Sequence, residues 1–381
     1  MVINHLEKLI ITSDAATIVK EVEVQHPAAK MIALAADMQQ KEAGDGSNFV
    51  LTLCGELMDK AESLIKEGLH PSDILTGYEK ASKKSLEILE SLIAHNVEDI
   101  RDVEEVTKVM KAVVSSKHYG NENTLAPLIS QACIHSMPDS NIPFNVENVR
   151  VAKVLGGSLN DSTVVKGLAI LRPSETSINH VDDAKIAVFN CELQADHGDT
   201  KGTVLFKSAE ELIAYTKSEE ESMEKFIKGV ADAGVNVVIA GGTISDIAIH
   251  FLEKYKIMTL KILSKFELKR IAKAVGATCL VRHEAPTPDE MGHAQRVSTD
   301  EIASTNVTVI SREEVDNKLS TIIIRGSTQS MLEDSERAVD DGVNTFKNMT
   351  RDTRFCAGAG ATEVHLASQL QTFAKCQPGL D

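Results

Sequence analysis

The chain contains no tryptophan, and aromatic residues make up only 4% of it. Platforms that stack nucleic-acid bases need exposed aromatic rings, so this composition argues against single-stranded nucleic acid as a ligand. Basic residues are also in the minority, because 40 Lys and Arg stand against 56 Asp and Glu, for a formal net charge of −16. A surface for duplex nucleic acid or an anionic membrane is therefore not expected.

Long apolar runs and closely spaced cysteines are absent as well. No apolar stretch approaches the length that crosses a bilayer, and the opening residues MVINHLEKLI lack the charged, apolar and small-residue order of a secretory signal. Widely separated cysteines without a Cys-x-x-Cys pair suit reduced, separately buried thiols rather than a disulfide or zinc framework. We therefore expect a cytoplasmic protein. The cysteines are Cys54, Cys133, Cys191, Cys279, Cys356 and Cys376.

At 381 residues the chain is too long for one ordinary core, so two or three domains are expected. Residues 1 to about 137 carry apolar residues at three- and four-residue spacing, which predicts packed helices, one of them from Pro71 to His95. From about Val149 short β-branched runs alternate with amphipathic helices, which predicts an α/β arrangement. The final residues return to a helical pattern. The first and last pieces are therefore expected to form one body, with the middle inserted into it.

The segment GDGSN, from Gly44 to Asn48, stands directly before an apolar helical run. Glycines let a backbone turn tightly, and free N–H groups at a helix start attract an anion. The amides and the Ser47 hydroxyl would face a phosphate, whereas Asp45 would need a divalent cation or an attacking water between itself and that phosphate. This combination is typical of a nucleotide site, although a plain turn before a helix uses the same residue types.

Three other segments accompany this loop in a particular order. TSDAATIVKEVEVQHPAAK precedes it, and RGSTQSMLEDSERAVDDGVNTF and CAGAGATE follow far downstream. In this order the set resembles the group II chaperonins, the ATP-driven double-ring folding machines of archaea and the eukaryotic cytosol. The resemblance covers the whole chain in register. It implies a multidomain α and α/β fold: an incomplete helical equatorial domain, an α/β intermediate domain and an α/β apical domain with a helical protrusion, nested in sequence.

The same resemblance divides the chain into five segments. The equatorial domain takes 1–95 and 354–381, the intermediate domain takes 96–163 and 319–353, and the apical polypeptide-binding domain takes 164–318. The inserted layout indicated by the sequence pattern agrees with this division. The resemblance also implies ATP and Mg²⁺ as cofactors. The implied partners are paralogous subunits in a double ring and unfolded client polypeptides.

The catalytic positions of the family match Asp45 and Asp341. In the family the loop aspartate helps to hold Mg²⁺ and the attacking water, and the second aspartate, on an intermediate-domain helix, completes hydrolysis when a hinge closes. A carboxylate carried by a moving domain orients water only in the closed state, which couples hydrolysis to closure. Asp340 is a rival for the role of Asp341, and without the resemblance both would be acids on a solvated helix face. The nucleotide-binding positions match Asp14, Thr17, Gly44, Gly46, Ser47, Asn48, Gly358 and Gly360.

The chain departs from the family pattern in several places. Ala359 replaces the middle glycine of the G-G-G-A-x-E turn, and Ala357 stands where a proline is usual. If the backbone needs a positive φ at residue 359, alanine there costs about 1 kcal/mol. The family's G-P-x-G-M-x-K-M phosphate-binding segment would lie before Met1, and the helical segment that reaches the adenine would follow Asp381. Half of the nucleotide site is therefore expected to be missing.

Two features of the apical segment match the family. The acidic residues at about 203–232 match the protrusion region, although a solvated helix face explains the same charge. SDIAIHFLEKYKI matches the substrate-facing helix, where Asp246, His250 and Lys254 recur at i, i+4, i+8 spacing. We assign these three residues to client contact. No second His or Cys stands at ligand spacing from His250, so no metal site is predicted there.

The sequence is compatible with three functions. The first is an ATP-dependent chaperonin subunit that binds and encloses unfolded polypeptides in a hetero-oligomeric double ring, with ATP hydrolysis driving lid closure. The second is a truncated, non-enzymatic polypeptide-binding or regulatory fragment of such a subunit, without ATPase activity of its own. The third is an unrelated α/β nucleotide- or sugar-dependent enzyme that uses AGGT, Ala240 to Thr243, although no paired nucleophile and base stand out.

Overall fold

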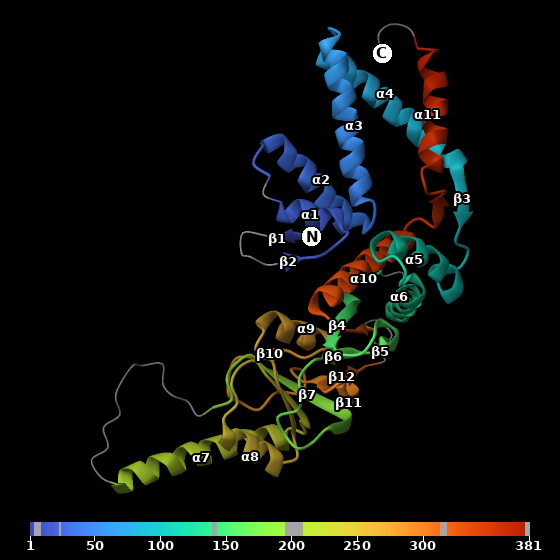
Figure 1. Cartoon of the computed structure of the whole chain (residues 1–381). Coiled ribbons are helices and arrows are strands. Elements are labelled where there is room, and N and C mark those ends of the chain that lie inside the picture. The colour runs from blue at the N-terminus through green and yellow to red at the C-terminus, as the bar shows by residue number, and fades with distance from the viewer. Residues whose placement is uncertain (4–8, 23, 139–142, 195–208, 313–317, 378–381) are drawn as a thin grey trace. The chain divides into compact units, whose positions relative to one another are not determined.

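The chain folds into two compact units (Figure 1). The helical unit takes Met1–Ile134, Pro143–Val146 and Gln329–Asp381, and the sheet unit takes His135–Ile142 and Glu147–Thr328. The helical unit is thus discontinuous in sequence. The division into three domains over five segments stays a prediction. The computed structural model describes residues 1–3, 9–22, 24–138, 143–194, 209–312 and 318–377.

The helical unit is built largely from helices that begin at recognisable caps. Its helices are α1 (Ala15–Glu21), α2 (Pro27–Ala43), α3 (Ser47–Lys66), α4 (Pro71–Leu89), α5 (Val103–Lys117), α6 (Glu122–Ser136, the last two residues in the sheet unit), α10 (Gln329–Met349) and α11 (Ala361–Ala374). Pro27 and Pro71 open α2 and α4, where a missing N–H costs no helical hydrogen bond. The preceding His26 and His70 cap these helices, since each Nδ1 accepts a 3.2 Å hydrogen bond from a first-turn N–H.

Helix α10 lies at the centre of the helical unit, packed against α2 and α5. The ring of Phe346 is fully buried and meets Phe144 edge to face, with 5.0 Å between the ring centroids. Gly342 lets α10 come close to α6, because a Cβ atom there would lie 3.0 Å from Cδ1 of Ile129. The helix that carries Asp341 is therefore held on several sides.

Short strand pairs complete the helical unit. They are β1 (Val2–Ile3) with β2 (Leu9–Ile10), and β3 (Ile93–Asn96) with β14 (Arg354–Cys356), both antiparallel, and a 3-10 turn η1 (Glu90–Leu92) precedes β3. The prediction of a helix from Pro71 to His95 is wrong at its end, because α4 stops at Leu89. The backbone after it pairs with a strand far along the chain, a contact that helical periodicity does not reveal.

The sheet unit contains one seven-stranded and one three-stranded sheet. The larger has the order β6-β12-β11-β7-β8-β9, with β10 also paired to β7. Strands β7, β8, β9 and β10 are parallel, whereas β11, β12 and β6 join antiparallel. The bounds are β6 (Leu168–Ile170), β7 (His180–Phe189), β8 (Val237–Ala240), β9 (Met258–Lys261), β10 (Cys279–Leu280), β11 (Gly292–Ile302) and β12 (Thr305–Ser311), with α7 (Ala209–Asp232), α8 (Asp246–Lys254) and α9 (Lys265–Val275) between them.

Helices cover both faces of the seven-stranded sheet. Neighbouring strand residues point to opposite faces. Val238 and Ala240 of β8 therefore pack with residues of α7 and α8, whereas Val237 and Ile239 pack with residues of α9. The helix expected in the acidic region is α7, while residues 203–208 lie outside the described part. That α7 projects from the body stays a prediction.

The three-stranded sheet has β13 (Ser320–Gly326) in its middle, parallel to β4 (Val149–Leu155) and antiparallel to β5 (Thr163–Lys166). Short 3-10 turns η2 (Val146–Asn148) and η3 (Leu159–Asp161) flank β4.

The predicted multidomain α and α/β fold is confirmed. Among the described residues, none of the helices is both long and apolar enough for a membrane crossing.

Candidate functional site

Two glycines close the turn between α2 and α3. Gly44 ends α2 with a φ of 78°, and Gly46 precedes α3 with a φ of 82°. Both backbones lie in the positive φ region, which glycine adopts without the strain that a Cβ atom brings. The side chain of Gln39 supports the turn, because its Nε2 donates a 2.9 Å hydrogen bond to the carbonyl oxygen of Asp45. Of the three turn residues, Gly44, Asp45 and Gly46, only Asp45 has a side chain.

Ser47 provides the test of whether an anion fits this turn. It is the first residue of α3, it is 0% exposed, and its Oγ has no hydrogen-bond partner among the described residues. No side chain of the described residues caps α3, and the first N–H groups of a helix have no partner within it. Buried polar atoms are seldom left unpaired, and a helix N-terminus favours negative charge. A phosphate fits the residues present, because it would accept hydrogen bonds from the hydroxyl and the amides.

A group of four polar side chains, the carboxylate cluster, lies at the end of α2 next to this turn. Its members are Asp14, Gln40, Lys117 and Asp341. The two aspartates are 2% and 1% exposed. The Lys117 ammonium lies 2.9 Å from Oδ1 of Asp14 and 3.3 Å from Oδ2 of Asp341. Gln40 Nε2 donates hydrogen bonds of 3.0 Å to Oδ2 of Asp14 and 3.3 Å to Oδ1 of Asp341.

Local structure explains where three of these side chains stand. Asp14 is the N-cap of α1, and its Oδ2 accepts hydrogen bonds from Thr17 N at 3.0 Å and Thr17 Oγ1 at 2.5 Å. Lys117 is the last residue of α5, and its carbonyl oxygen accepts a hydrogen bond from Ser13 Oγ. Asp341 lies in the middle of α10. Capping alone would explain a buried Asp14, but it would not explain why Asp341 is buried beside it.

The turn and α10 are in direct contact. A Cβ atom at Gly44 would overlap the carbonyl oxygen of Asp341 and would lie 2.7 Å from Cβ of Asn344. Thr345 Oγ1 donates a 3.3 Å hydrogen bond to the carbonyl oxygen of Ala43. Glycine at residue 44 therefore serves two purposes, a positive φ and the close approach of α10.

The charges of the cluster shift the pKa values of its members. Burial raises the pKa of Asp341 from 3.8 to about 7, against the opposing Lys117 charge and Gln40 hydrogen bond, and the negative charge of Asp14 adds to the increase. Burial also acts to raise the pKa of Asp14, but hydrogen bonds from Thr17 and Lys117 outweigh it and the pKa is lowered. Burial acts to lower the pKa of Lys117, but the charge of Asp341 and contact with Asp14 raise it. Asp341 can thus exchange a proton near neutral pH, as a general base must.

The structure brings together some of the predicted site residues. Asp14, Thr17, Gly44 and Asp341 meet at the cluster. Gly46 and Ser47 follow at the start of α3, with Asn48 exposed in its first turn. Asp45 is partly exposed, and the hydrogen bonds and ion pairs of the cluster do not include its carboxylate. Asp340, the rival of Asp341, is exposed and lies outside the cluster.

The downstream glycine turn lies apart from these contacts. Gly358 and Gly360 are exposed at the start of α11, and they take no part in the hydrogen bonds or ion pairs of the cluster. Ala359 has a φ of 56°. The backbone at residue 359 therefore has the positive φ considered above, and alanine occupies a conformation that favours glycine.

The three residues assigned to client contact are exposed along α8 in the sheet unit. Lys254 is already paired, because its Nζ lies 2.5 Å from Oε1 of Glu224 on α7. His250 and Asp246 make the exposed surface of α8 polar. No group of three or more His, Cys, Asp or Glu side chains in the described ranges could hold a metal ion. Client contact by this face stays a prediction.

Two members of the cluster, Gln40 and Lys117, were not predicted from the sequence. Lys117 falls in SSKHYGNEN, which reads as a connector, whereas the structure extends α5 through Lys117. Gln40 stands on an amphipathic helix among other polar residues. A lone lysine and a lone glutamine carry no spacing signal, so only the packing of α2, α5 and α10 reveals them.

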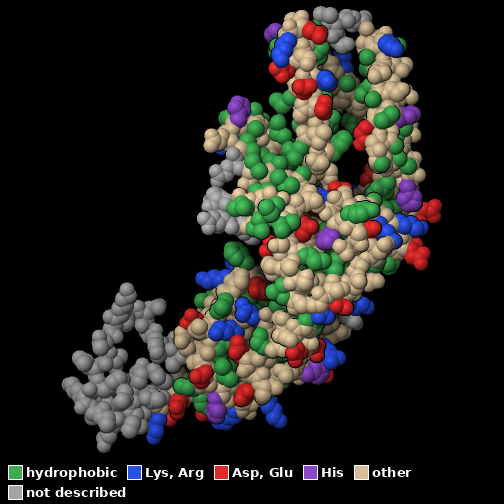
Figure 2. Space-filling view, in the orientation of Figure 1, with side chains coloured by type: hydrophobic (Ala, Val, Ile, Leu, Met, Phe, Trp, Pro, Cys, Tyr) green, Lys and Arg blue, Asp and Glu red, His purple; other side chains and the backbone are tan. Residues whose placement is uncertain are grey.

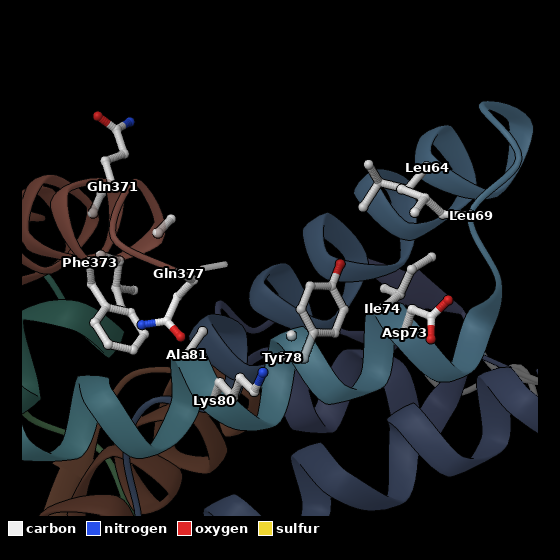
Figure 3. A pocket seen from close by; sticks show the side chains of 14 residues that line it. Leu64, Leu69, Asp73, Ile74, Tyr78, Lys80, Ala81, Gln371, Phe373 and Gln377 are labelled. Carbon is white, nitrogen blue, oxygen red and sulfur yellow. The ribbon is translucent and has the colours of Figure 1, made fainter. Parts of the chain in front are cut away.

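A large pocket in the helical unit lies away from this chemistry (Figure 3). It has a volume of about 460 Å³ and lies between α3, α4 and α11, with Tyr78, Ile74 and Phe373 among its lining residues. Its walls are mainly apolar, and none of the residues of the GDG turn or the carboxylate cluster lines it. The candidate site is therefore the turn with the cluster.

Comparison with known proteins assigns the family. The model of the TCP-1/cpn60 chaperonin family matches residues 1–381. T-complex protein 1 subunit theta of Dictyostelium discoideum is 48% identical over 380 residues, covering 100% of this chain and 71% of the relative. The proteins of the same name from Gallus gallus and Homo sapiens are 49% and 48% identical over 381 residues, covering 100% of this chain and 69% of each relative. The chain therefore belongs to the TCP-1/cpn60 chaperonin family, which confirms the resemblance found in its motifs.

Proposed function

We propose that this chain acts as an ATP-hydrolysing subunit of a cytoplasmic, hetero-oligomeric chaperonin double ring that binds and encloses unfolded polypeptides, with ATP hydrolysis driving lid closure. The names of its relatives, each a subunit of T-complex protein 1, support an assembly of different subunits. One observation carries the ATPase part of the proposal. Asp341 is buried beside Asp14, and its helix touches the GDG turn.

In this proposal the residues divide the work at the site. The Ser47 hydroxyl and the first amides of α3 hold the phosphates, and Asp45 holds Mg²⁺. Bound MgATP supplies the phosphoanhydride bond that is cleaved. Asp341 orients the attacking water and accepts its proton, for which a pKa of about 7 is suited. Lys117 balances the negative charge that gathers there.

The position of Asp341 suggests how turnover is coupled to movement. Its contacts with Gln40 and Lys117 exist only while α10 is packed against α2 and α5. Movement of α10 away from α2 would remove the base from the turn while leaving Asp45 and Ser47 in place. Hydrolysis would then occur only in the closed arrangement, in which water orientation is complete.

Replacement of Asp45 tests this function. Asp45→Asn removes the charge proposed to hold Mg²⁺ without changing the side-chain volume. In the full-length chain assembled with its partner subunits, we expect ATP turnover at this subunit's site to fall by about 100-fold. Asp59→Asn, an exposed change on α3, is the matched control. Unchanged Mg²⁺-dependent hydrolysis at this site in Asp45→Asn would reject the proposal.

A second candidate is polypeptide binding without ATP turnover. Large apolar side chains are exposed on the helical unit, where Figure 2 shows them gathered over α2 and α3. Met31 is 70% exposed, Leu34 62% and Met58 55%. Exposed apolar surface of this kind favours contact with another chain. Hydrolysis of MgATP by the chain of residues 1–381 alone would exclude this candidate.

A further inference from the structure

Gln40 contacts both aspartates of the carboxylate cluster. Its carboxamide nitrogen donates to Oδ2 of Asp14 at 3.0 Å and to Oδ1 of Asp341 at 3.3 Å. Lys117 contacts the other oxygen of each carboxylate, Oδ1 of Asp14 at 2.9 Å and Oδ2 of Asp341 at 3.3 Å. The four side chains thus form a closed ring in which acids alternate with donors.

The chemistry of a primary amide suits this position. The NH₂ group has two N–H bonds, so one nitrogen can serve two acceptors, and it does so without adding charge. With two carboxylates and one ammonium, a neutral bridge leaves the ring with a net charge of −1 when both acids are ionised. A methionine has nearly the shape of glutamine but donates nothing. A glutamate has its shape but exchanges both donors for acceptors and adds a charge.

Gln40 is also the residue through which the GDG turn closes. Its own carbonyl oxygen accepts a 2.9 Å hydrogen bond from the N–H of Gly44, the C-cap of α2. The same residue therefore connects to the turn through its backbone and to Asp341 through its side chain. A displacement of Asp341 would therefore be transmitted through Gln40 to Gly44, the residue next to Asp45.

We propose that Gln40 is a positioning residue that fixes the Asp341 carboxylate against Asp14 by bridging one oxygen of each. Oδ1 of Asp341 is used by this bridge. Oδ2 faces the Lys117 ammonium as an ion pair and makes no aligned hydrogen bond with the described residues. The consequence for catalysis rests on the proposed ATPase function, whereas the bridge itself does not.

The catalytic consequence is tested by Gln40→Met in the full-length chain assembled with its partner subunits. Loss of the bridge leaves the Asp341 carboxylate free to rotate, so kcat for ATP should fall by about 10-fold while KM for ATP changes by less than about twofold. Gln371→Met, an exposed change on α11, should leave both values unchanged. A Gln40→Met enzyme with the kcat of the unchanged protein contradicts the positioning role.

The bridge is tested without any ATP by a double-mutant cycle in urea unfolding. Gln40→Glu should lower the urea midpoint at pH 8, because three carboxylates then face one ammonium. Asp341→Asn should restore it in the double variant, since the new amide can donate to Glu at residue 40, with donor and acceptor exchanged. The increase in urea midpoint caused by Asp341→Asn should therefore be larger in the Gln40→Glu background than in the unchanged chain. In a Gln371→Glu background, Asp341→Asn should raise the midpoint by the same amount as in the unchanged chain.

The two readouts separate the two ideas. If the assembled, unchanged protein hydrolyses no ATP at this site, the proposed function fails, and the unfolding cycle still decides whether the bridge exists. If Gln40→Glu and Asp341→Asn act additively, the bridge is wrong whatever the ATPase activity is. Coupled unfolding together with a selective loss of kcat supports the inference in full.

Discussion

The ammonium of Lys117 lies 3.3 Å from Oδ2 of Asp341, on a helix from the other end of the chain. Asp14 shares the same ammonium at 2.9 Å. Two buried carboxylates therefore share one largely buried ammonium, with Gln40 as the neutral fourth member of the cluster. The same contacts therefore contribute to the stability of the helical unit and hold Asp341, the residue proposed as the catalytic base.

Removal of Lys117 should be costly. Lys117→Met leaves the Asp14 and Asp341 carboxylates buried without their counter-charge, and breaking a buried ion pair on one side costs about 3 kcal/mol in the free energy of unfolding. Urea unfolding at pH 8 measures this loss. Lys60→Met removes an exposed lysine near Asp59 and should cost less than about 0.5 kcal/mol. Equal effects of the two changes would contradict the account of the cluster.

The raised pKa of Asp341 should make stability depend on pH. Because the native pKa is about 7 and the ordinary value is 3.8, the folded chain holds a proton between these values that the unfolded chain has released. This group's contribution therefore falls as pH rises from about 4 to about 7, by up to about 1.4 kcal/mol per pH unit. The pKa of Asp14 is lowered, so its contribution to stability changes in the opposite direction. That contribution is lost as the pH falls through 3.8 and below.

Asp341→Asn tests this dependence directly. The variant cannot ionise at residue 341, so the decrease in its free energy of unfolding between pH 4 and pH 7 should be smaller than in the unchanged chain. It should be the more stable protein at pH 8 by at least about 1 kcal/mol. The same pH dependence in both proteins would show that Asp341 does not titrate in this range.

Alanine at Gly44 should disrupt the contact between the turn and α10. Gly44→Ala places a Cβ atom against the carbonyl oxygen of Asp341 at a φ of 78°, so we expect a loss of about 2 kcal/mol or more. Gly55→Ala is the matched control, because no atom in the described part of the chain lies within 4 Å of a Cβ there. In the middle of α3, that change should instead stabilise by about 0.5 to 1 kcal/mol. Thermal unfolding of both variants shows whether their signs differ.

Glycine at residue 359 should relieve backbone strain. Ala359 has a φ of 56°, and the following residue, Gly360, has a φ of 82°. Ala359→Gly should therefore raise the free energy of unfolding, by less than about 1 kcal/mol because glycine also gains entropy in the unfolded chain. A glycine variant that is less stable than the unchanged chain would mean that the turn tolerates alanine without strain.

Sequence patterns predicted several strands that are rich in β-branched residues. VNVVIAGG corresponds to β8, which is buried throughout, and a buried strand is apolar on both faces. VRVAKVL corresponds to β4, in which Arg150 and Lys153 interrupt the apolar residues. Strands β11 and β12 were not predicted. Exposed polar residues interrupt β11, and Ala303 and Ser304 turn the chain with positive φ, where a glycine would have indicated a hairpin.

The candidate site was predictable only in part. The glycines of the turn follow from local backbone demands, which a sequence displays directly. Asp14 and Asp341 were identified through the family resemblance, since an acid on an acidic helix has no local signature. Gln40 and Lys117 enter through the packing of three helices distant in sequence, which no spacing rule expresses.

The most direct test of the central claim is the ATPase activity of Asp341→Ala in the full-length chain assembled with its partner subunits, with Asp340→Ala as the control from the neighbouring position. If Asp341 is the base at this subunit's site, its removal should lower turnover there by about 100-fold or more, while Asp340→Ala remains close to the unchanged protein. Full turnover in Asp341→Ala, or equal losses in both variants, would contradict the assignment of the buried aspartate as the catalytic one.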